Sequence, residues 1–281
     1  MITRSLPFYE IADGVFEIDE FECASMFVIV GSERALLIDT GVGIGDLRWV
    51  LENRITDKPY DVVISHAHGD HFGGAGFFER VFVNEKDLDW NRNPQMTTIE
   101  FRRHYAEMIA ARGGGKHFDY DPGRDIRPWE RTPEKVPIRD GHIFELGGRT
   151  VSCFDCPGHT PGEMVFIDDQ SRILFCADAC NRNLILGSGW NCSREEMLRE
   201  AADGLQRIIG MRDRYDAVFN GHHDFRGFGQ SLFPEALGDA LQCMREMLEG
   251  TAAWIEVEDQ LNPGTMKKVA EHGLIQITSR L

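Results

Sequence analysis

The chain has 281 residues, of which 42% are hydrophobic and 27% are charged, and its formal net charge is -16 at pH 7. This length allows one large domain or two small ones around a substantial core. The acidic balance argues against nonspecific binding to nucleic acid or to an anionic membrane, because both require basic patches. No apolar run approaches the roughly 20 residues that span a bilayer, and residues 1–7 lack the apolar segment of a secretion signal.

Cysteine usage indicates the compartment. The seven cysteines form an odd set without a regular framework, which is typical of a reducing environment, so we expect a cytoplasmic protein. Cys153 and Cys156 have the C-x-x-C spacing of a redox or zinc pair, but no second pair accompanies them. Because Cys153 falls in a strand-like run, the preferred interpretation is a pair of small buried thiols.

The N-terminal segment predicts a sheet. Residues 14–40 alternate and cluster apolar side chains around a turn at Gly31-Ser32, which indicates a β-meander. Apolar residues at helical spacing then predict a helix over 46–53, and a β-branched run predicts a strand over 61–65.

Residues 84–136 form a different kind of segment, a helical and irregular insertion. It contains a predicted helix over 99–112, ended by three glycines at 113–115, and then a stretch rich in proline and charge. Such a segment is either a lid over a site or a structural excursion. Arg102 and Arg103 on this helix could meet a substrate carboxylate, but the preferred interpretation is that they are solvated. The aromatic candidates for substrate contact here and in the loop 181–191 are Trp90, Tyr105, Trp129 and Trp190.

Strands and helices continue to mix after this insertion. A capping box at Ser193–Glu196 opens one helix, and a C-terminal helix of about 234–249 with a tail occupies residues from about 226 to 281. Because no linker or repeat is visible, we predict one α/β domain over 1–281, with two sheets covered by helices. Further strands are predicted at 143–154, 164–167, 172–176, 216–219 and, as a final edge strand, 274–277.

The most informative segment is His66-Ala67-His68-Gly69-Asp70-His71, which directly follows the apolar run 62–64. It contains four potential metal ligands within six positions. Three imidazoles and a carboxylate are costly to bury without partners, whereas a divalent metal satisfies all of them together. The segment therefore predicts a metal site.

The same local pattern recurs where other predicted strands end. Functional groups gather at the carboxyl ends of strands in α/β folds, because the loops there share one edge of the sheet. We therefore expect distant residues to converge with the histidine segment. The residues expected to converge are His159, Asp178 and His222, while Asp39 and His223 also follow predicted strands.

In this order the motifs resemble the metallo-β-lactamase superfamily. The H-x-H-x-D-H signature lies at 66–71 and is followed by Pro157-Gly158-His159-Thr160-Pro161-Gly162, Ala177-Asp178 and Gly221-His222, with Asp39-Thr40-Gly41 upstream. The resemblance spans roughly residues 14 to 225. It implies an αββα sandwich, in which two mixed β-sheets are flanked by helices and metals lie at one edge.

The resemblance also implies the ligands. One metal would be held by His66, His68 and His159, and a second by Asp70, His71 and His222, with the Asp178 carboxylate bridging both. His223 competes for the last position, and we favour His222 because it directly follows the strand-end glycine. The implied cofactors are two divalent metal ions, with zinc preferred and iron or manganese as alternatives. The remaining histidines, His104, His117, His142 and His272, are expected to be surface or packing residues.

This ligand set implies hydrolysis by a hydroxide that the two metals activate. Asp70 is expected both to bind metal and to orient the hydroxide, and Asp39 is expected to support the histidine loop or a ligand imidazole. His223 either donates a proton to the leaving group or points outward.

Asp178 narrows the substrate class. Family members that open β-lactams typically have cysteine at this position or lack the bridging acid, whereas thioesterases, lactonases and phosphodiesterases keep aspartate. We therefore predict a metal-dependent hydrolase of a small ester, thioester or lactone. The alternatives are a phosphodiesterase and a mononuclear-iron, persulfide dioxygenase-like oxidoreductase, which would use His66, His159 and Asp178. The expected partner is a small-molecule substrate, without nucleic acid or membrane, and a homo-oligomer is left open.

Overall fold

The computed structural model describes residues 1–90, 94–112, 119–223, 225–259, 262 and 264–279. Its first sheet has seven strands in sequence order. The first four are antiparallel, which confirms the predicted meander, and β4 to β7 are parallel. The strands are β1 (Phe8–Ala12), β2 (Val15–Asp19), β3 (Ser25–Val30), β4 (Ala35–Ile38), β5 (Tyr60–Ile64), β6 (Arg80–Asn84) and β7 (Glu134–Ile138).

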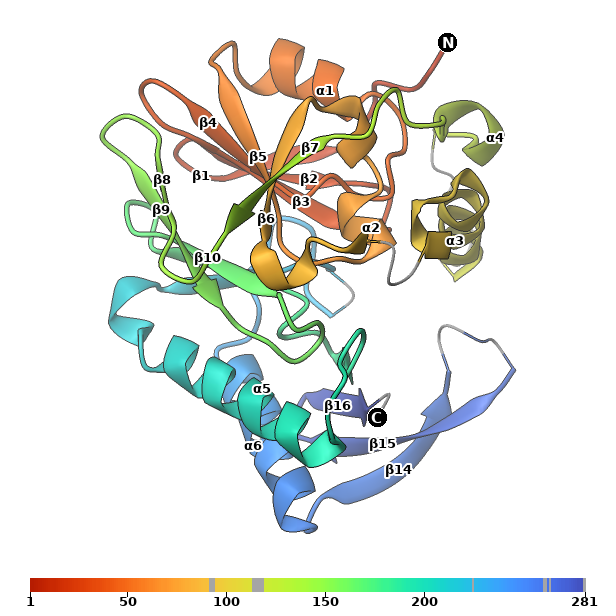
Figure 1. Ribbon diagram of the computed structural model, residues 1–281, viewed down its shortest axis with the longest axis vertical. Helices are drawn as coiled ribbons and strands as arrows, with labels where there is room; N and C mark the ends of the chain where they lie inside the picture. Colours follow the sequence, from red (N-terminus) through yellow and green to blue (C-terminus); the bar gives the residue numbers. More distant parts are fainter. Residues whose placement is uncertain (91–93, 113–118, 224, 260–261, 263, 280–281) are drawn as a thin grey trace.

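The second sheet has five strands in the order β13-β11-β10-β9-β8. It packs face to face on the first sheet, since one buried cluster joins Phe27 and Ile38 of the first sheet to Phe166 and Phe175 of the second. The predicted αββα sandwich is therefore present (Figure 1). The strands are β8 (Ile143–Glu145), β9 (Thr150–Asp155), β10 (Met164–Asp168), β11 (Ile173–Ala177) and β13 (Ala217–Asn220).

Helices cover the outer faces of the sandwich (Figure 1). The predicted helix 99–112 is present as α3. The predicted capping box opens α5: the Ser193 hydroxyl accepts a hydrogen bond from the Glu196 N–H, and the Glu196 carboxylate accepts one from the Ser193 N–H. The α-helices are α1 (Leu47–Val50), α2 (Gly69–Phe72), α3 (Ile99–Arg112), α4 (Pro122–Asp125), α5 (Arg194–Ile209) and α6 (Ala236–Glu249). A π-helical turn spans Leu51–Ile55, and 3₁₀ turns span Ala75–Phe77, Glu85–Asp87, Pro94–Thr97 and Arg212–Arg214.

A third sheet departs from the prediction for the C-terminus. Four strands pair in the order β12-β16-β15-β14, namely β12 (Asn183–Leu186), β14 (Ala253–Glu258), β15 (Met266–His272) and β16 (Ile275–Ser279). The strand predicted at 274–277 is present as β16, but its predicted edge position is wrong, because β16 is paired on both sides. Its alternation buries Ile275 and Ile277 beside α6, a contact that a local pattern cannot reveal.

Two further predictions can be compared with the structure. All seven cysteines are free and Cys153 and Cys156 are buried, as expected for packing thiols. The glycines at 113–115 and His117 lie outside the described residues.

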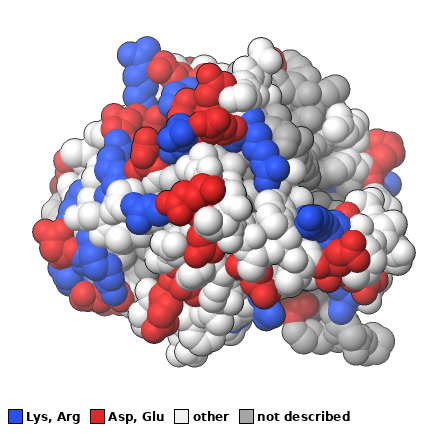
Figure 2. All heavy atoms as spheres, turned by 90° about the horizontal axis from the view of Figure 1, so that it is seen from below, with Lys and Arg blue, Asp and Glu red and all other residues white. Residues whose placement is uncertain are grey.

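In the ranges that the structure describes, no helix combines the length and apolar character needed to cross a membrane. On the face shown in Figure 2, basic side chains are interspersed with acidic ones.

Candidate metal centre

The seven predicted ligand residues converge at the edge where the two sheets of the sandwich meet. His66 and His68 follow β5, Asp70 and His71 lie in α2, and the other three follow strands of the second sheet. His159 lies in the loop after β9, Asp178 directly follows β11, and His222 lies two residues after β13. Each imidazole or carboxylate thus lies in the loop or short helix that follows the end of a strand, as expected for an α/β fold. Their role as ligands remains a prediction.

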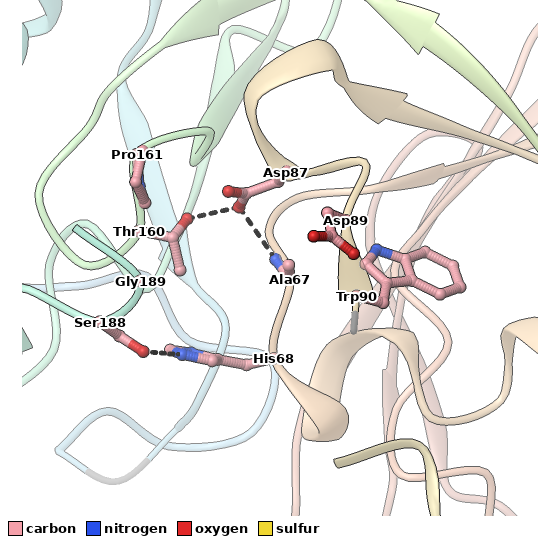
Figure 3. Close-up of a pocket in the computed structure, with 9 residues that line it drawn as sticks. All are labelled: Ala67, His68, Asp87, Asp89, Trp90, Thr160, Pro161, Ser188 and Gly189. Carbon is pink, nitrogen blue, oxygen red and sulfur yellow. Dashed lines mark hydrogen bonds between the residues drawn. The ribbon is translucent and has the colours of Figure 1, made fainter. Parts of the chain in front are cut away.

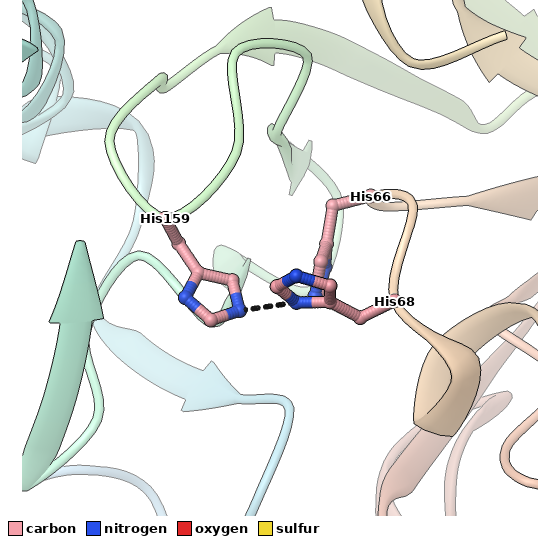
Figure 4. Close-up of side chains that lie close together, drawn as sticks. All are labelled: His66, His68 and His159. Carbon is pink, nitrogen blue, oxygen red and sulfur yellow. Dashed lines mark hydrogen bonds between the residues drawn. The ribbon is translucent and has the colours of Figure 1, made fainter. Parts of the chain in front are cut away.

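The first group comprises His66, His68 and His159 (Figure 4). One ligand atom from each lies within 4.8 Å of the others, and all three residues are buried. His68 Nδ1 and His159 Nε2 are 2.7 Å apart. His66 Nε2 is buried and has no hydrogen-bond partner.

The second group comprises Asp70, His71 and His222. Asp70 Oδ2 lies 3.6 Å from His222 Nε2 and 3.9 Å from His71 Nε2. Asp178 stands between the groups, with Oδ1 3.5 Å from His71 Nε2 and Oδ2 3.4 Å from His159 Nε2 and 3.3 Å from His222 Nε2. Its position is that of a carboxylate able to serve both groups.

Orphaned polar atoms test whether these residues fit metal ions. His66 Nε2, His71 Nε2 and Asp178 Oδ1 are all buried without a hydrogen-bond partner. Burial of such atoms is costly unless something else satisfies them. Gly221 leaves room for these two side chains, because a Cβ at this position would lie 2.6 Å from Asp178 Oδ1 and 2.7 Å from His71 Cε1. Imidazole nitrogens and carboxylate oxygens are zinc ligands, so the donor set fits divalent metals.

The nitrogens on the far side of the imidazoles are held in place. His71 Nδ1 lies 2.9 Å from Asp39 Oδ2, and His66 Nδ1 lies 3.0 Å from Ser65 Oγ. Asp39 also accepts from the Ser65 N–H and hydroxyl, both at 2.7 Å. Such contacts fix the tautomer and the ring orientation of a ligand histidine. Asp39 thus makes the supporting contacts expected of it, at a left-handed φ of 65° that is strained for a residue other than glycine.

Two more imidazoles of the cluster, those of His68 and His159, are anchored in the same way. His159 Nδ1 lies 2.5 Å from the Ile185 carbonyl oxygen in β12, and His68 Nε2 lies 2.7 Å from Ser188 Oγ. Both contacts come from the segment that follows Asp178 in the chain. The third sheet therefore helps to orient the site, since β12 is one of its strands.

Carboxylates control the charge of His71. Burial alone would lower the pKa of this imidazole, but Asp178, Asp39 and Asp70 raise it from 6.5 to about 10. Burial and the neighbouring imidazoles instead hold the pKa of His66 well below its usual value. At neutral pH the cluster therefore combines a neutral imidazole in the first group with a protonated one in the second.

Metal uptake by His71 is therefore expected to release a proton, because only the neutral imidazole binds metal. In protein stripped of metal by chelation, affinity for the second zinc equivalent should rise with pH and level off near the His71 pKa of about 10. Calorimetry in buffers of different ionisation enthalpy would count the protons released. An affinity that does not change between pH 6.5 and 9 would contradict this expectation.

Sequence reasoning missed Asp87, which joins the two loops of the first group (Figure 3). Its Oδ2 accepts from the Ala67 N–H at 3.0 Å and from the Thr160 hydroxyl at 2.6 Å, and its Oδ1 accepts from the Gly162 N–H at 3.2 Å. Asp87 is 3% exposed. No local pattern marks it, because its partners lie 20 to 75 residues away.

Asp87→Asn is expected to loosen the first group of ligands. An amide can accept with one oxygen only, so one of the three donors would face its NH₂ group. We expect affinity for the first zinc to fall about tenfold or more and stability to fall by about 1–3 kcal/mol, measured by chelator competition and denaturant titration. Asp213→Asn, at an exposed aspartate, is the control. Equal zinc affinity in both variants would refute the joining role.

Other predicted residues have varied positions. Trp90 lines a pocket beside His68 (Figure 3). Trp129 donates a hydrogen bond from its ring N–H to the Gly73 carbonyl oxygen. Trp190 packs on the core under α5 and α6. Tyr105 contacts Asp70 directly. His104 is exposed, His142 packs against Phe144, and His272 pairs with Glu246, in agreement with their expected surface or packing roles.

The expectation that Arg102 is solvated is wrong. Arg102 is 1% exposed and donates to the carbonyl oxygens of Val42, Gly43 and Arg127. Backbone carbonyls at the turn after β4 create this site, and they leave no mark in the local sequence. The four-residue spacing from Arg102 to the buried Ala106 was the available signal that it faces inward.

His223 pairs with Asp19 and belongs to none of the groups of converging ligand atoms among the described residues. Its Nε2 lies 3.1 Å from Asp19 Oδ1 at the end of β2. Among the described residues, His222 and not His223 belongs to a group with converging ligand atoms. The geometry thus favours His222 as the last ligand, and the proton-donor role of His223 stays a prediction.

Comparison with known proteins agrees with this fold. A family model for the metallo-beta-lactamase superfamily matches residues 20–183. The acyl-coenzyme A thioesterase MBLAC2 of Bos taurus is 28% identical over 238 residues, which cover 78% of this chain and 81% of the relative. An atrochrysone carboxyl ACP thioesterase of a Cryptosporiopsis strain is 30% identical over 153 residues, covering 53% of this chain and 35% of that protein.

A solved structure is similar as well. A metallo-beta-lactamase from Pontibacter korlensis superposes with a TM-score of 0.56 at 19% identity, covering 86% of this chain and 99% of the other. This likeness concerns the fold alone, whereas the family model covers more than half of the chain and includes the histidine segment. The chain therefore belongs to the metallo-beta-lactamase superfamily.

Proposed function

We propose that the protein is a metal-dependent thioester hydrolase with a dinuclear centre, and that zinc is the metal. The observation that carries this proposal is the convergence of seven buried or half-buried ligand residues, with Asp178 between the two groups. His66, His68 and His159 would hold one ion, and Asp70, His71 and His222 the other. When bound, such ions supply Lewis acidity and lower the pKa of a water molecule.

The side chains of the protein would orient the water molecule and the substrate. Asp70 carries a carboxylate at the boundary of the second group, where it can orient a water molecule by accepting a hydrogen bond from it. The pocket beside His68 is lined by Ala67, Trp90, Pro161 and Ser188, among others (Figure 3). Because this pocket adjoins the first group, we propose that it receives part of the substrate.

The leaving group distinguishes a thioester from an ordinary ester. An alkoxide needs a proton as it leaves. A thiolate has much less need of one, because thiols have a pKa of about 8–9. The sequence candidate for a proton donor, His223, is turned toward Asp19. This position of His223 suits a leaving group that needs little protonation, and the relatives whose names record an activity include thioesterases that act on acyl-coenzyme A and on acyl carrier protein. An acyl thioester is therefore the proposed substrate class.

A substrate panel tests this function. The zinc-loaded chain should release free thiol from acyl-coenzyme A, or from a simple S-acyl thiol, faster than it opens a lactone, a phosphodiester or a cephalosporin. Chelation should abolish the activity, and zinc should restore it. Loss of oxygen from solution with a persulfide substrate and one bound iron would contradict the proposal, as would a zinc-loaded chain without thioester hydrolysis.

A further inference from the structure

The insertion contributes a hydroxyl group to the edge of the candidate second metal site. Tyr105 in α3 donates a hydrogen bond from its hydroxyl to Asp70 Oδ2 at 2.7 Å. The same oxygen faces His222 Nε2 at 3.6 Å and His71 Nε2 at 3.9 Å. One carboxylate oxygen is therefore shared between a phenol of the insertion and the ligand nitrogens of the second group.

The helix that carries Tyr105 is fixed to the body of the fold. Arg102, one turn before Tyr105, donates from Nε to the Val42 carbonyl oxygen at 2.6 Å and from Nη1 to the Arg127 carbonyl oxygen at 3.0 Å. Arg102 is buried, so this anchor is shielded from water. It ties α3 to the turn that follows β4, and that turn is part of the first sheet's site edge.

The insertion also lies directly against the helix that carries Asp70. At Gly69, a Cβ would lie 2.7 Å from Phe101 Cε1 and 2.9 Å from the Met96 carbonyl oxygen. Only glycine fits at such an approach, so α2 and the insertion are packed with no space between them. Figure 1 shows α3 beside α2. The hydroxyl of Tyr105 is consequently held at a set place relative to Asp70.

Chemistry determines what this contact does. A carboxylate only accepts hydrogen bonds and a phenol, ionising near pH 10, is a donor, so the direction of the bond is fixed. A hydrogen bond to an ionised acceptor is short and strong, and it removes the rotational freedom of the carboxylate. Partners of ligand side chains tune metal affinity in this way.

We propose that Tyr105 is a positioning residue: its hydroxyl, carried by the insertion, holds Asp70 with Oδ2 toward His71 and His222. The insertion is thus part of the second metal site and not only a cover over one sheet face. This inference rests on the proposed dinuclear function, which it deepens.

Stepwise removal of metal tests the inference. The full chain loaded with two zinc equivalents is titrated with a chelator, and the bound zinc is counted at each step. In Tyr105→Phe the more weakly held equivalent should leave at about tenfold lower chelator concentration, while the other equivalent behaves as in the parent. Tyr120→Phe is the matched control, because it removes another hydroxyl that bonds to α3, at the Ala106 carbonyl oxygen.

Three outcomes are distinguishable. Selective weakening of one equivalent in Tyr105→Phe, with Tyr120→Phe like the parent, supports the positioning role. Unchanged release in Tyr105→Phe, or equal weakening of both equivalents together with a lower melting temperature, overturns it. A parent chain that never holds a second equivalent overturns the dinuclear function itself, and this is seen before any variant is compared.

Discussion

Asp178→Asn is expected to reduce kcat/KM for a thioester by at least about a hundredfold and to release zinc, while the chain stays folded. Asp178 is 5% exposed and lies within 3.5 Å of the ligand nitrogens of His71, His159 and His222. Asparagine keeps the volume but carries no charge, and its NH₂ group cannot bind a cation. Steady-state kinetics and bound zinc per chain, measured on the same preparation, check both effects.

A control separates the site from general charge effects. Asp216→Asn removes a carboxylate that is exposed on the surface and paired with Arg172, so it should leave activity and zinc content unchanged. Far-ultraviolet circular dichroism would establish that Asp178→Asn is folded. Turnover and zinc content equal to those of the parent in Asp178→Asn would mean that the carboxylate does not bridge the two groups.

Arg226→Met is expected to have the largest effect on stability. Arg226 and Glu17 are a fully buried ion pair, with Arg226 Nη2 2.7 Å from Glu17 Oε1. Arg226 also donates to the side chain and the carbonyl oxygen of Asn220, so it links β2 to the end of β13. Removing one partner of a buried pair costs about 3–5 kcal/mol. For a chain of this size the melting temperature should fall by about 10 °C.

The matched control uses the same substitution at the surface. Arg172→Met breaks an exposed pair with Asp216 and should cost less than about 1 kcal/mol. Differential scanning calorimetry of both variants at equal zinc loading gives the comparison. If Arg226→Met melts within about 2 °C of Arg172→Met, the buried pair does not carry the stability assigned to it.

The sequence predicted the parts of the site that depend on local pattern. The meander, the helix at 99–112 and the capping box at Ser193 each rest on residues that are neighbours in the chain, and the structure confirms them. The candidate ligand residues each lie in a loop or short helix that follows a strand, so the rule on strand ends sufficed to predict that they meet. The family and the hydrolase class followed from the order of the motifs, and the comparisons support both.

What the sequence did not reveal depends on contacts between distant segments. Asp87 meets Thr160, Arg102 meets the turn after β4, and Tyr105 meets Asp70, and each acquires its role only when the chain has folded. The third sheet is another case, because β12 and β16 pair across some 90 residues of chain. Propensity and periodicity describe one segment at a time, so they cannot specify such partners.

The most direct measurement is the metal content of the purified chain after zinc loading and removal of excess zinc, determined by elemental analysis. The dinuclear site predicts two zinc equivalents per chain and, after Asp178→Asn, fewer than two. A single equivalent in the parent chain, or iron retained in place of zinc, would contradict it.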